Sequence, residues 1–251
     1  MANERDTVRP FIAAVLAHCT GLQAVQFFAV VDRASTDGTV AILQELSQAD
    51  ARVTVVWAEA SRCVVDAYVR GYQEAIAAQC DWILEIDAGF SHAPTDIPKF
   101  LAKMQQGYDC VFGSRFCRGG KISDSSWRRY VISWGGTFLT NLLLGTKLAD
   151  MTSGFEMFSR RALQAVLDNG IHSRNHFFQT EIRVFCHHFR IAEVPIHYRS
   201  ASASVNNSVV QEAFKNLWRL TRQRLNGRLW QVDLCAQYSR HPLGATAKLT
   251  D

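Results

Sequence analysis

Apolar residues follow two patterns along the chain: short runs of β-branched and aromatic residues, and longer segments with helical spacing. Buried strands are predicted for the short runs at 26–32 (QFFAVVD), 53–58, 82–87 (WILEID), 108–114 and 191–198. A helix is predicted after the second strand, because Val65, Tyr72 and Ile76 fall on one face. This alternation predicts an α/β fold with a mostly parallel sheet and helices on both faces.

The alternation weakens after Arg115. Residues 116–128 are rich in Gly and Ser, and a loop of this length is typically functional or mobile. Residues 130–144 are apolar around most of the helix circumference. This pattern leaves two interpretations, a core helix or a helix lying in a membrane interface. Further along, we expect a strand within 150–158 and helices over 159–170 and 177–188.

The chain is predicted to divide into an α/β domain over residues 1–205 and a C-terminal amphipathic, basic helix with a tail over 206–251. In the helix at 207–226, one side is expected to carry Val210, Phe214, Leu217, Thr221 and Leu225. The other side carries Lys215, Arg219 and Arg222. Such a basic face is either solvated or binds anionic lipid headgroups.

Composition narrows the classes of function. Hydrophobic residues make up 48% and charged residues 20%, which is enough apolar surface for a large core. The net charge of +4 is too small and too dispersed to indicate nucleic acid as the partner. The seven cysteines form no C-x-x-C pair and indicate reduced thiols in a cytoplasmic protein, not a zinc site. Because no apolar run reaches the length of a spanning helix, we expect a soluble protein or one that is peripheral on the inner face of the membrane.

Acidic residues follow the predicted strands at the sheet edge where open α/β folds bind ligands. Asp32 opens the turn VDRASTDGT, which suits binding of a nucleoside, although Asp37 is also well placed to cap the next helix. Asp87 ends EID and is a candidate oxygen ligand for Mg2+ or Mn2+. Its alternative role is a strand-end carboxylate that accepts bonds from loop amides.

Six segments together resemble one family. The turn VDRASTDGT resembles the V-D-D-G-S-x-D-G-T segment of inverting family 2 glycosyltransferases with the GT-A fold, and EIDAGFSHAP resembles their D-A-D-x-S-H-x-P metal loop. The segments GSRF, DMTSGFEMFSR, FFQTEI and EVPIHYR follow in the order found in dolichyl- and polyprenyl-phosphate sugar synthases. The resemblance covers about residues 3–204.

The resemblance implies a nucleotide-sugar donor whose diphosphate is held by Mg2+ or Mn2+ on Asp87. It assigns donor contacts to Asn3, Glu4, Asp32, Asp37, Asp87, Arg199 and Ser204. It also implies that Arg115 and Arg129, with Ser133 beside them, contact the acceptor phosphate, which suits the forked guanidinium group. A lipid phosphate acceptor needs no general base, whereas a glycan hydroxyl acceptor requires one, such as Asp150 or Glu181.

Several positions depart from the family pattern. Gly89 stands where the second metal aspartate is expected, Arg33 replaces an aspartate, and Val205 replaces a lysine. These departures favour a second hypothesis, a non-catalytic nucleotide-sugar-binding or scaffold protein. Relatives begin with a strand that ends in P-x-x-N-E, and this chain begins near that point, so we expect a central strand to be missing. A membrane-protein partner is expected where relatives carry transmembrane helices.

Overall fold

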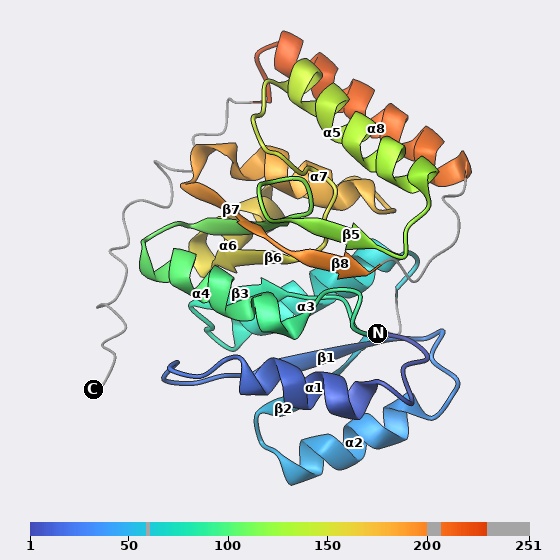
Figure 1. The fold of residues 1–251 in the computed structure, drawn as a ribbon, viewed down its shortest axis with the longest axis vertical. Coiled ribbons are helices and arrows are strands. Elements are labelled where there is room, and N and C mark those ends of the chain that lie inside the picture. Colours follow the sequence, from blue (N-terminus) through green and yellow to red (C-terminus); the bar gives the residue numbers. More distant parts are fainter. Residues whose placement is uncertain (59–60, 200–206, 230–251) are drawn as a thin grey trace.

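The computed structural model describes residues 1–58, 61–199 and 207–229 (Figure 1). Its strands are β1 (Phe27–Asp32), β2 (Val53–Ala58), β3 (Trp82–Glu85), β4 (Cys110–Ser114), β5 (Lys121–Ser123), β6 (Glu156–Ser159), β7 (Ile191–Pro195) and β8 (His197–Arg199). Its α-helices are α1 (Val8–Ala17), α2 (Thr39–Ala49), α3 (Val64–Ala77), α4 (Ile97–Gln105), α5 (Trp127–Leu144), α6 (Arg160–Asn169), α7 (Phe177–Phe185) and α8 (Asn207–Leu225). Short 3-10 turns occupy Pro94–Asp96 and Cys186–His188.

The strands form three hydrogen-bonded sheets. Strands β1 and β2 pair in parallel, and the order β3-β6-β4-β7 makes a four-stranded sheet in which β6 runs antiparallel to both neighbours. Strands β5 and β8 form a small parallel ribbon. Helix α3 packs directly on β1, where a Cβ at Gly71 would lie 2.8 Å from Val30 Cγ2. This close approach lets α3 link the two-stranded sheet to the larger one.

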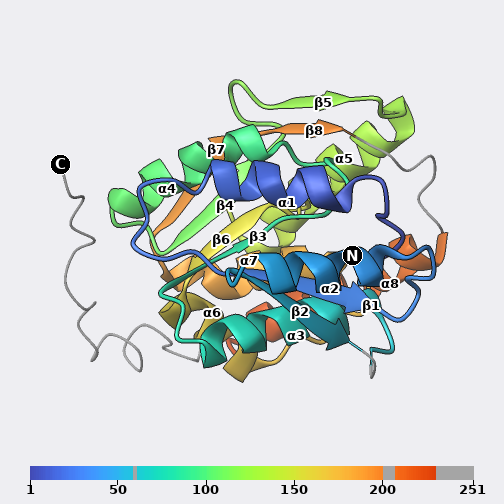
Figure 2. The same ribbon diagram turned by 90° about the horizontal axis from the view of Figure 1, so that it is seen from below.

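Two hydrophobic cores lie on opposite faces of the sheets. Alternate residues of β4 point into different cores, with Cys110 and Phe112 on one side and Val111 on the other. Helices α3, α6, α7 and α8 contribute to the first core, and α1, α2 and α4 to the second. Figure 2 shows α1 and α4 on one side of the strands and α3 and α6 on the other. The prediction of an α/β fold with helices on both faces is confirmed.

Local predictions differ from the structure at several places, among them the single strand expected at 191–198, which is divided into β7 and β8. Helix α1 was not predicted, because its charged start hides the apolar stripe of Val8, Phe11, Ile12 and Val15. The strand expected to reach Asp87 ends at Glu85, so Asp87 lies in a loop. The strand expected within 150–158 starts only at Glu156.

Helices α5 and α8 lie side by side as an outer layer (Figure 1). Helix α5 buries Thr137, Thr140 and Leu144, while much of its circumference is exposed, so it is not the core helix of the first interpretation. On α8 the predicted apolar face was wrong. Phe214 and Leu225 are 58% and 77% exposed, whereas Leu217, Leu220 and Thr221 are buried. No helix within the described ranges is both long enough and apolar enough to cross a membrane.

Two buried glutamates face each other in the larger sheet. Glu85 of β3 and Glu156 of β6 are direct cross-strand partners. Tyr72 donates a hydrogen bond to Glu85, and Arg183 lies 3.1 Å from Glu156. Burial raises the pKa of Glu85 well above its usual range and that of Glu156 to about 7. Because this pair has one cation, it keeps a proton near neutral pH.

We expect Glu85→Gln to become more stable relative to the parent as the pH rises from about 5 to about 8. Both carboxyls bind protons more tightly in the folded state, so their stabilising effect is fully present below the unfolded pKa of 4.5 and is lost as the pH rises through the raised pKa values, which for Glu156 is about 7. Replacing one carboxyl by an amide reduces this pH-dependent loss in the free energy of unfolding by roughly 1–2 kcal/mol. Urea unfolding across this pH range measures the difference.

The exposed substitution Glu45→Gln is the matched control and should show no such trend. A pH-independent difference between Glu85→Gln and the parent would contradict the shared-proton interpretation.

Candidate functional site

The first group of candidate residues lies at the carboxyl end of β1. Asp32 Oδ1 accepts a hydrogen bond from the backbone N–H of Ala34 at 2.9 Å, and Oδ2 accepts one from the Ser61 hydroxyl at 3.2 Å. These two bonds fix the Asp32 carboxylate beside the turn at 33–38. Asp32 therefore stands at the sheet edge where α/β folds bind ligands.

Asp37 has a structural role in the same turn. Its Oδ1 accepts from the backbone N–H of Thr39 at 3.0 Å and from the Thr39 hydroxyl, and its Oδ2 accepts from the backbone N–H of Arg5 at 2.9 Å. The bond from the Thr39 hydroxyl is the main cause that lowers the pKa of Asp37. Asp37 directly precedes the N-cap residue Gly38; it accepts a bond from the first backbone N–H of α2 and also links this helix start to the N-terminal segment.

Asn3 and Glu4 pack on this turn as well. Asn3 Oδ1 accepts from the backbone N–H of Thr36 at 3.0 Å, and the backbone N–H of Glu4 donates to Thr39 Oγ1 at 2.8 Å. The Glu4 carbonyl accepts from the N–H of Val8 at 2.7 Å and so starts helix α1. The four residues that we assigned to the donor at this end of the chain are thus brought together.

Asp87 lies in the loop after β3, next to a buried histidine. Its Oδ1 accepts a hydrogen bond from the Tyr68 hydroxyl, and its Oδ2 lies 3.6 Å from His92 Nδ1. His92 is 1% exposed, and neither ring nitrogen has a hydrogen-bond partner among the described residues. Burial lowers the pKa of His92, so the imidazole is neutral at neutral pH. The Asp87 side chain stays 32% exposed.

Gly89 borders the carboxylate of Glu4. Its φ of +78° is favourable for glycine, and a Cβ built there would lie 3.0 Å from both carboxylate oxygens of Glu4. One of these oxygens also accepts a bond from the Thr7 hydroxyl. The Glu4 carboxylate therefore occupies the space beside position 89, two residues from Asp87. Among the described side chains, no group of three or more His, Cys, Asp or Glu residues is arranged to hold a metal.

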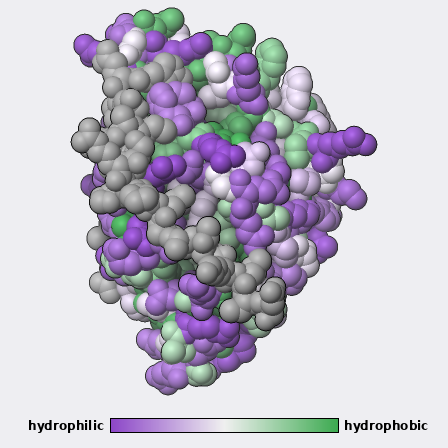
Figure 3. Space-filling model, turned by 90° about the vertical axis from the view of Figure 1, so that its left-hand side faces the viewer, coloured by the Kyte–Doolittle hydropathy of each residue, from purple (hydrophilic) through white to green (hydrophobic). Residues whose placement is uncertain are grey.

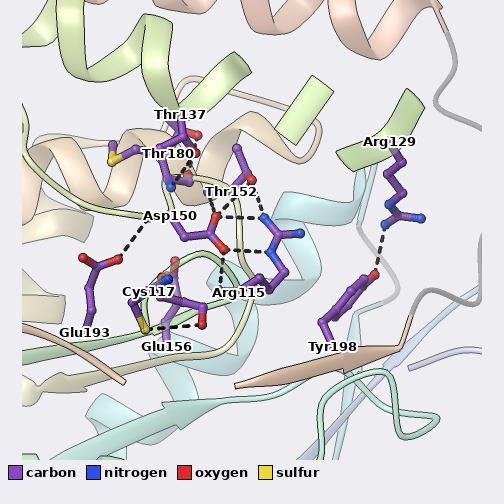
Figure 4. A network of polar contacts seen from close by, with 12 residues as sticks. Arg115, Cys117, Arg129, Thr137, Asp150, Thr152, Glu156, Thr180, Glu193 and Tyr198 are labelled. Atoms are coloured by element: carbon purple, nitrogen blue, oxygen red, sulfur yellow. Dashed lines mark hydrogen bonds and ion pairs between the residues drawn. The ribbon is translucent and has the colours of Figure 1, made fainter. Parts of the chain in front are cut away.

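Asp150 forms a buried ion pair with Arg115 (Figure 4). Asp150 Oδ2 accepts from Arg115 Nε at 2.7 Å and from the Arg115 backbone N–H at 3.0 Å, and Oδ1 accepts from Nη2 at 2.8 Å. Burial favours the neutral acid, but the charge and hydrogen bonds of Arg115 outweigh it and lower the pKa of Asp150 to about 2. Asp150 is therefore a fixed anion and a weak proton acceptor.

The loop around Asp150 is held by three further elements. Glu193 of β7 accepts from two successive backbone N–H groups, those of residues 149 and 150, at 2.8 and 3.0 Å. Thr137 of α5 accepts from the backbone N–H of Met151 at 3.1 Å, and Thr180 of α7 donates to the Met151 carbonyl at 2.7 Å. The loop thereby joins β4, β7, α5 and α7.

Arg115 and Arg129 come together at the ring of Tyr198. Arg129 Nη2 donates to the Tyr198 hydroxyl at 2.9 Å, and the guanidinium carbons of Arg129 and Arg115 lie 5.6 and 5.5 Å from the ring centroid. Figure 4 shows that the Arg115 guanidinium has two nitrogens on Asp150 and Thr152, and that its third nitrogen is turned toward Tyr198 and Arg129. Both guanidinium groups thus lie against the ring of Tyr198, close enough together to suit the binding of one anion.

The remaining predicted residues have less defined places. Ser133 is half-buried on α5, one turn after Arg129. Arg199 ends β8 with an exposed side chain, and its backbone N–H donates to the Ser91 carbonyl at 2.8 Å. Ser204 and Val205 lie outside the described residues.

Sequence reasoning missed the contacts of Tyr68, Tyr198 and Glu193. Tyr68 lies among the apolar residues of α3 and belongs to none of the six motifs, although a tyrosine hydroxyl needs a polar partner when it is buried. Tyr198 precedes Arg199 within the segment EVPIHYR. Its place in this motif is the one sequence signal that could have indicated a role at the site. Glu193 accepts bonds from a loop more than forty residues away, and nothing in the local sequence signals that.

Comparison with known proteins identifies relatives over most of the chain. Polyprenol monophosphomannose synthase of Mycolicibacterium smegmatis is 28% identical over 230 residues, which cover 90% of this chain and 85% of the relative. Undecaprenyl-phosphate mannosyltransferase of Micrococcus luteus is 30% identical over 195 residues, covering 76% and 80%.

Solved structures share the fold. Glucosyl-3-phosphoglycerate synthase from Mycobacterium tuberculosis in complex with Mn2+ and UDP-glucose gives a TM-score of 0.59 at 15% identity, covering 90% of this chain and 77% of that one. Its complex with Mn2+, UDP and glucosyl-3-phosphoglycerate gives 0.57. The GT-A fold that the motifs implied is confirmed. The model of glycosyl transferase family 2 matches residues 1–167, well over half of the chain, and the chain belongs to this family of glycosyltransferases.

Proposed function

We propose that the protein transfers a sugar from a nucleotide diphosphate sugar to a polyprenyl phosphate, with inversion and with the aid of a divalent cation, at the cytoplasmic face of a membrane. The observation that carries this proposal is a row of contacts from Asp87 through His92 and Tyr198 to the two arginines. His92 Nδ1 lies 3.6 Å from Asp87, and the His92 and Tyr198 rings are 5.1 Å apart. The row joins the carboxylate assigned to the donor with the guanidinium groups assigned to the acceptor.

The reaction would be a single displacement. An oxygen of the acceptor phosphate attacks the anomeric carbon, the bond from that carbon to the donor diphosphate breaks, and the nucleoside diphosphate leaves with the electron pair. One displacement inverts the configuration at the anomeric carbon. Arg115 and Arg129 would hold the acceptor phosphate in line for this attack.

A phosphate acceptor agrees with the state of the two candidate bases. Asp150 is held as an anion with a pKa of about 2 by Arg115. Glu181 is buried and accepts bonds from Arg219 and from the backbone N–H of Ser173 at 2.9 Å. Because both carboxylates are already bonded, neither suits proton removal from a glycan hydroxyl. The names of the two curated relatives, which specify polyprenol and undecaprenyl phosphate, support the same acceptor class.

The residues near Asp87 fit a divalent cation in part. Asp87 is partly exposed, and the Glu4 carboxylate fills the space beside Gly89. Carboxylate oxygens suit both Mg2+ and Mn2+, and two of them with donor phosphates can complete the coordination. When bound, the cation would neutralise the charge that develops on the departing diphosphate. The solved structures with Mn2+ and UDP-sugar support this assignment at the level of the fold.

Asp87→Asn tests the proposed activity. We expect the transfer of labelled sugar from nucleotide sugars to polyprenyl phosphate to fall by about 100-fold or more, because the charge that holds the cation is removed. Label is measured in the lipid fraction after extraction. The exposed substitution Asp81→Asn is the control and should leave transfer unchanged.

Two results would contradict the proposal. Equal transfer by Asp87→Asn and the parent would exclude a role for the carboxylate. Binding of a nucleoside diphosphate that ignores Mn2+, with no transfer to any acceptor, would favour the non-catalytic hypothesis.

The substitution Arg129→Gln tests the proposed acceptor site, and a substitution of the adjacent Arg128 provides the comparison. We expect the KM for the polyprenyl phosphate to rise about tenfold or more, while the KM for the donor stays within about twofold, because Arg129 lies at Tyr198 and away from Asp32. Arg128→Gln is the matched control, since Arg128 is the adjacent arginine and its side chain is exposed. The KM is measured with a short-chain, water-soluble polyprenyl phosphate, so that membrane binding does not enter the comparison. Equal effects of the two substitutions would show that general charge, not position, matters.

A charge-relocation series tests whether Glu4 replaces the second metal aspartate. Glu4→Ala should weaken Mn2+ binding in the presence of a nucleoside diphosphate by about tenfold, and adding Gly89→Asp should restore part of it, because removing Glu4 frees the space that a side chain at 89 needs while the positive φ there still disfavours any residue but glycine. Mn2+ binding is measured by electron paramagnetic resonance, with Asp6→Asn as control. Unchanged Mn2+ affinity in Glu4→Ala would exclude this role for Glu4.

A further inference from the structure

Exposed apolar side chains gather on one pair of helices. Of the twelve large apolar residues that are exposed within the described ranges, ten belong to α5 or α8. Four of them are more than 60% exposed: Trp127 at 75%, Leu142 at 65%, Trp218 at 62% and Leu225 at 77%. A concentration of this kind marks an interaction surface, because single exposed apolar residues are normally scattered.

The exposed residues of α5 form a continuous stripe. Trp127, Val131, Trp134, Phe138 and Leu142 are spaced by three or four residues and so lie on one face along the helix. The rings of Trp134 and Phe138 are stacked, with centroids 6.0 Å apart. Since the buried positions of α5 lie on the other side, this stripe faces away from the protein.

Helix α8 extends this apolar surface. Its exposed Phe214, Trp218 and Leu225 lie along one side of the helix, and the buried Leu217 and Leu220 lie on an adjacent side that packs on the protein. Arg224 Nη1 donates to the Leu143 carbonyl of α5 at 2.7 Å, and Arg219 pairs with the buried Glu181. We call the five stripe residues of α5 and these three residues of α8 the α5–α8 face.

Basic residues border the α5–α8 face. Arg128 of α5 and Lys215 and Arg222 of α8 have exposed side chains. Helix α5 contains no acidic residue, and the one acidic residue of α8, Glu212, accepts bonds from the backbone N–H of Arg174 and from Asn216. Figure 3 shows green apolar and purple hydrophilic side chains together at the upper end of the molecule, where α5 and α8 end. Aromatic residues flanked by Lys and Arg, without acidic residues, complement an anionic lipid surface.

The face is continuous with the proposed acceptor site. Trp127 and Arg129 lie in the first turn of α5, two residues apart, so their side chains leave the helix on nearly opposite sides. Trp127 belongs to the α5–α8 face, whereas Arg129 reaches Tyr198. The start of α5 thus connects the exposed face with the arginines assigned to the acceptor phosphate.

We propose that the α5–α8 face docks on the surface of an anionic lipid bilayer, with the aromatic residues inserted at the headgroup boundary and the basic residues on lipid phosphates. The role of the bound membrane in supplying the acceptor rests on the proposed function, whereas the docking itself does not. In this arrangement the start of α5 lies at the bilayer, where the headgroup of a polyprenyl phosphate enters the site.

The experiment compares the parent with the double variant Trp134→Glu and Phe138→Glu. Binding is measured by co-sedimentation with vesicles of phosphatidylglycerol and phosphatidylcholine. We expect the double variant to bind at least about tenfold more weakly, because two exposed aromatic residues are replaced by anions. Trp57→Glu, an exposed tryptophan on β2, is the matched control and should bind like the parent. Thermal unfolding checks that all three proteins are folded.

A second variant separates charge from apolar insertion. Lys215→Glu with Arg222→Glu should lower binding to the anionic vesicles by about tenfold and leave binding to pure phosphatidylcholine unchanged. Equal vesicle binding by the aromatic double variant and the parent would overturn the proposal. A parent that forms a dimer in sedimentation equilibrium, which the aromatic double variant abolishes, and that ignores vesicles would also overturn it, since a second copy would then cover the face.

Activity measurements distinguish failure of this proposal from failure of the proposed function. The aromatic double variant should keep parental transfer to a water-soluble, short-chain isoprenyl phosphate and lose transfer to long-chain polyprenyl phosphate in vesicles. Absence of transfer to either acceptor by the parent, together with vesicle binding that depends on the α5–α8 face, would reject the proposed function and support docking. Loss of transfer to both acceptors by the double variant alone would place the face in the catalytic site and contradict a docking role.

Discussion

The buried ion pair between Arg115 and Asp150 organises the centre of the protein. Moving two charged groups out of water costs free energy unless hydrogen bonds within the protein replace those to water. Here Asp150 accepts hydrogen bonds from both the side chain and the backbone N–H of Arg115. The same loop is tied to β7 by Glu193 and to α5 by Thr137. The loop that carries Asp150 therefore sets the position of Arg115, just after β4, relative to the helix that carries Arg129.

This arrangement explains how an arginine can be both structural and available to a ligand. Two nitrogens of the Arg115 guanidinium bond to Asp150 and Thr152, and the third faces Tyr198 (Figure 4). The bonded side fixes the orientation of the planar group, so that the remaining edge is already placed for an anion. An exposed lysine at this position would lack both the fork and the fixed direction.

The sequence predicts those parts of the fold that depend on local pattern. The positions of β1, β2 and β4 and the apolar face of α3 follow from residue spacing, and the motifs place Asp32, Asp87 and Arg115 near the sheet edge. Features that depend on contacts between distant segments could not be predicted. The outward position of Phe214 on α8 is one, because an apolar residue on an amphipathic helix is normally assigned to the core. The Tyr198 ring between two arginines is another, since the residues that meet there are up to 83 positions apart in sequence, Arg115 and Tyr198 being the extremes.

The separation of the sheets has a mechanical consequence. Asp32 belongs to the β1–β2 pair, whereas Arg115 directly follows β4 and Tyr198 belongs to β8, and no backbone ladder between β1 and β3 occurs in the part of the chain that the structure describes. Helix α3, through the tight contact at Gly71, and the shared core around Val31 and Val111 hold the two units together. The position of Asp32 relative to Arg115 therefore depends on side-chain packing between the two units and not on a continuous ladder of backbone hydrogen bonds.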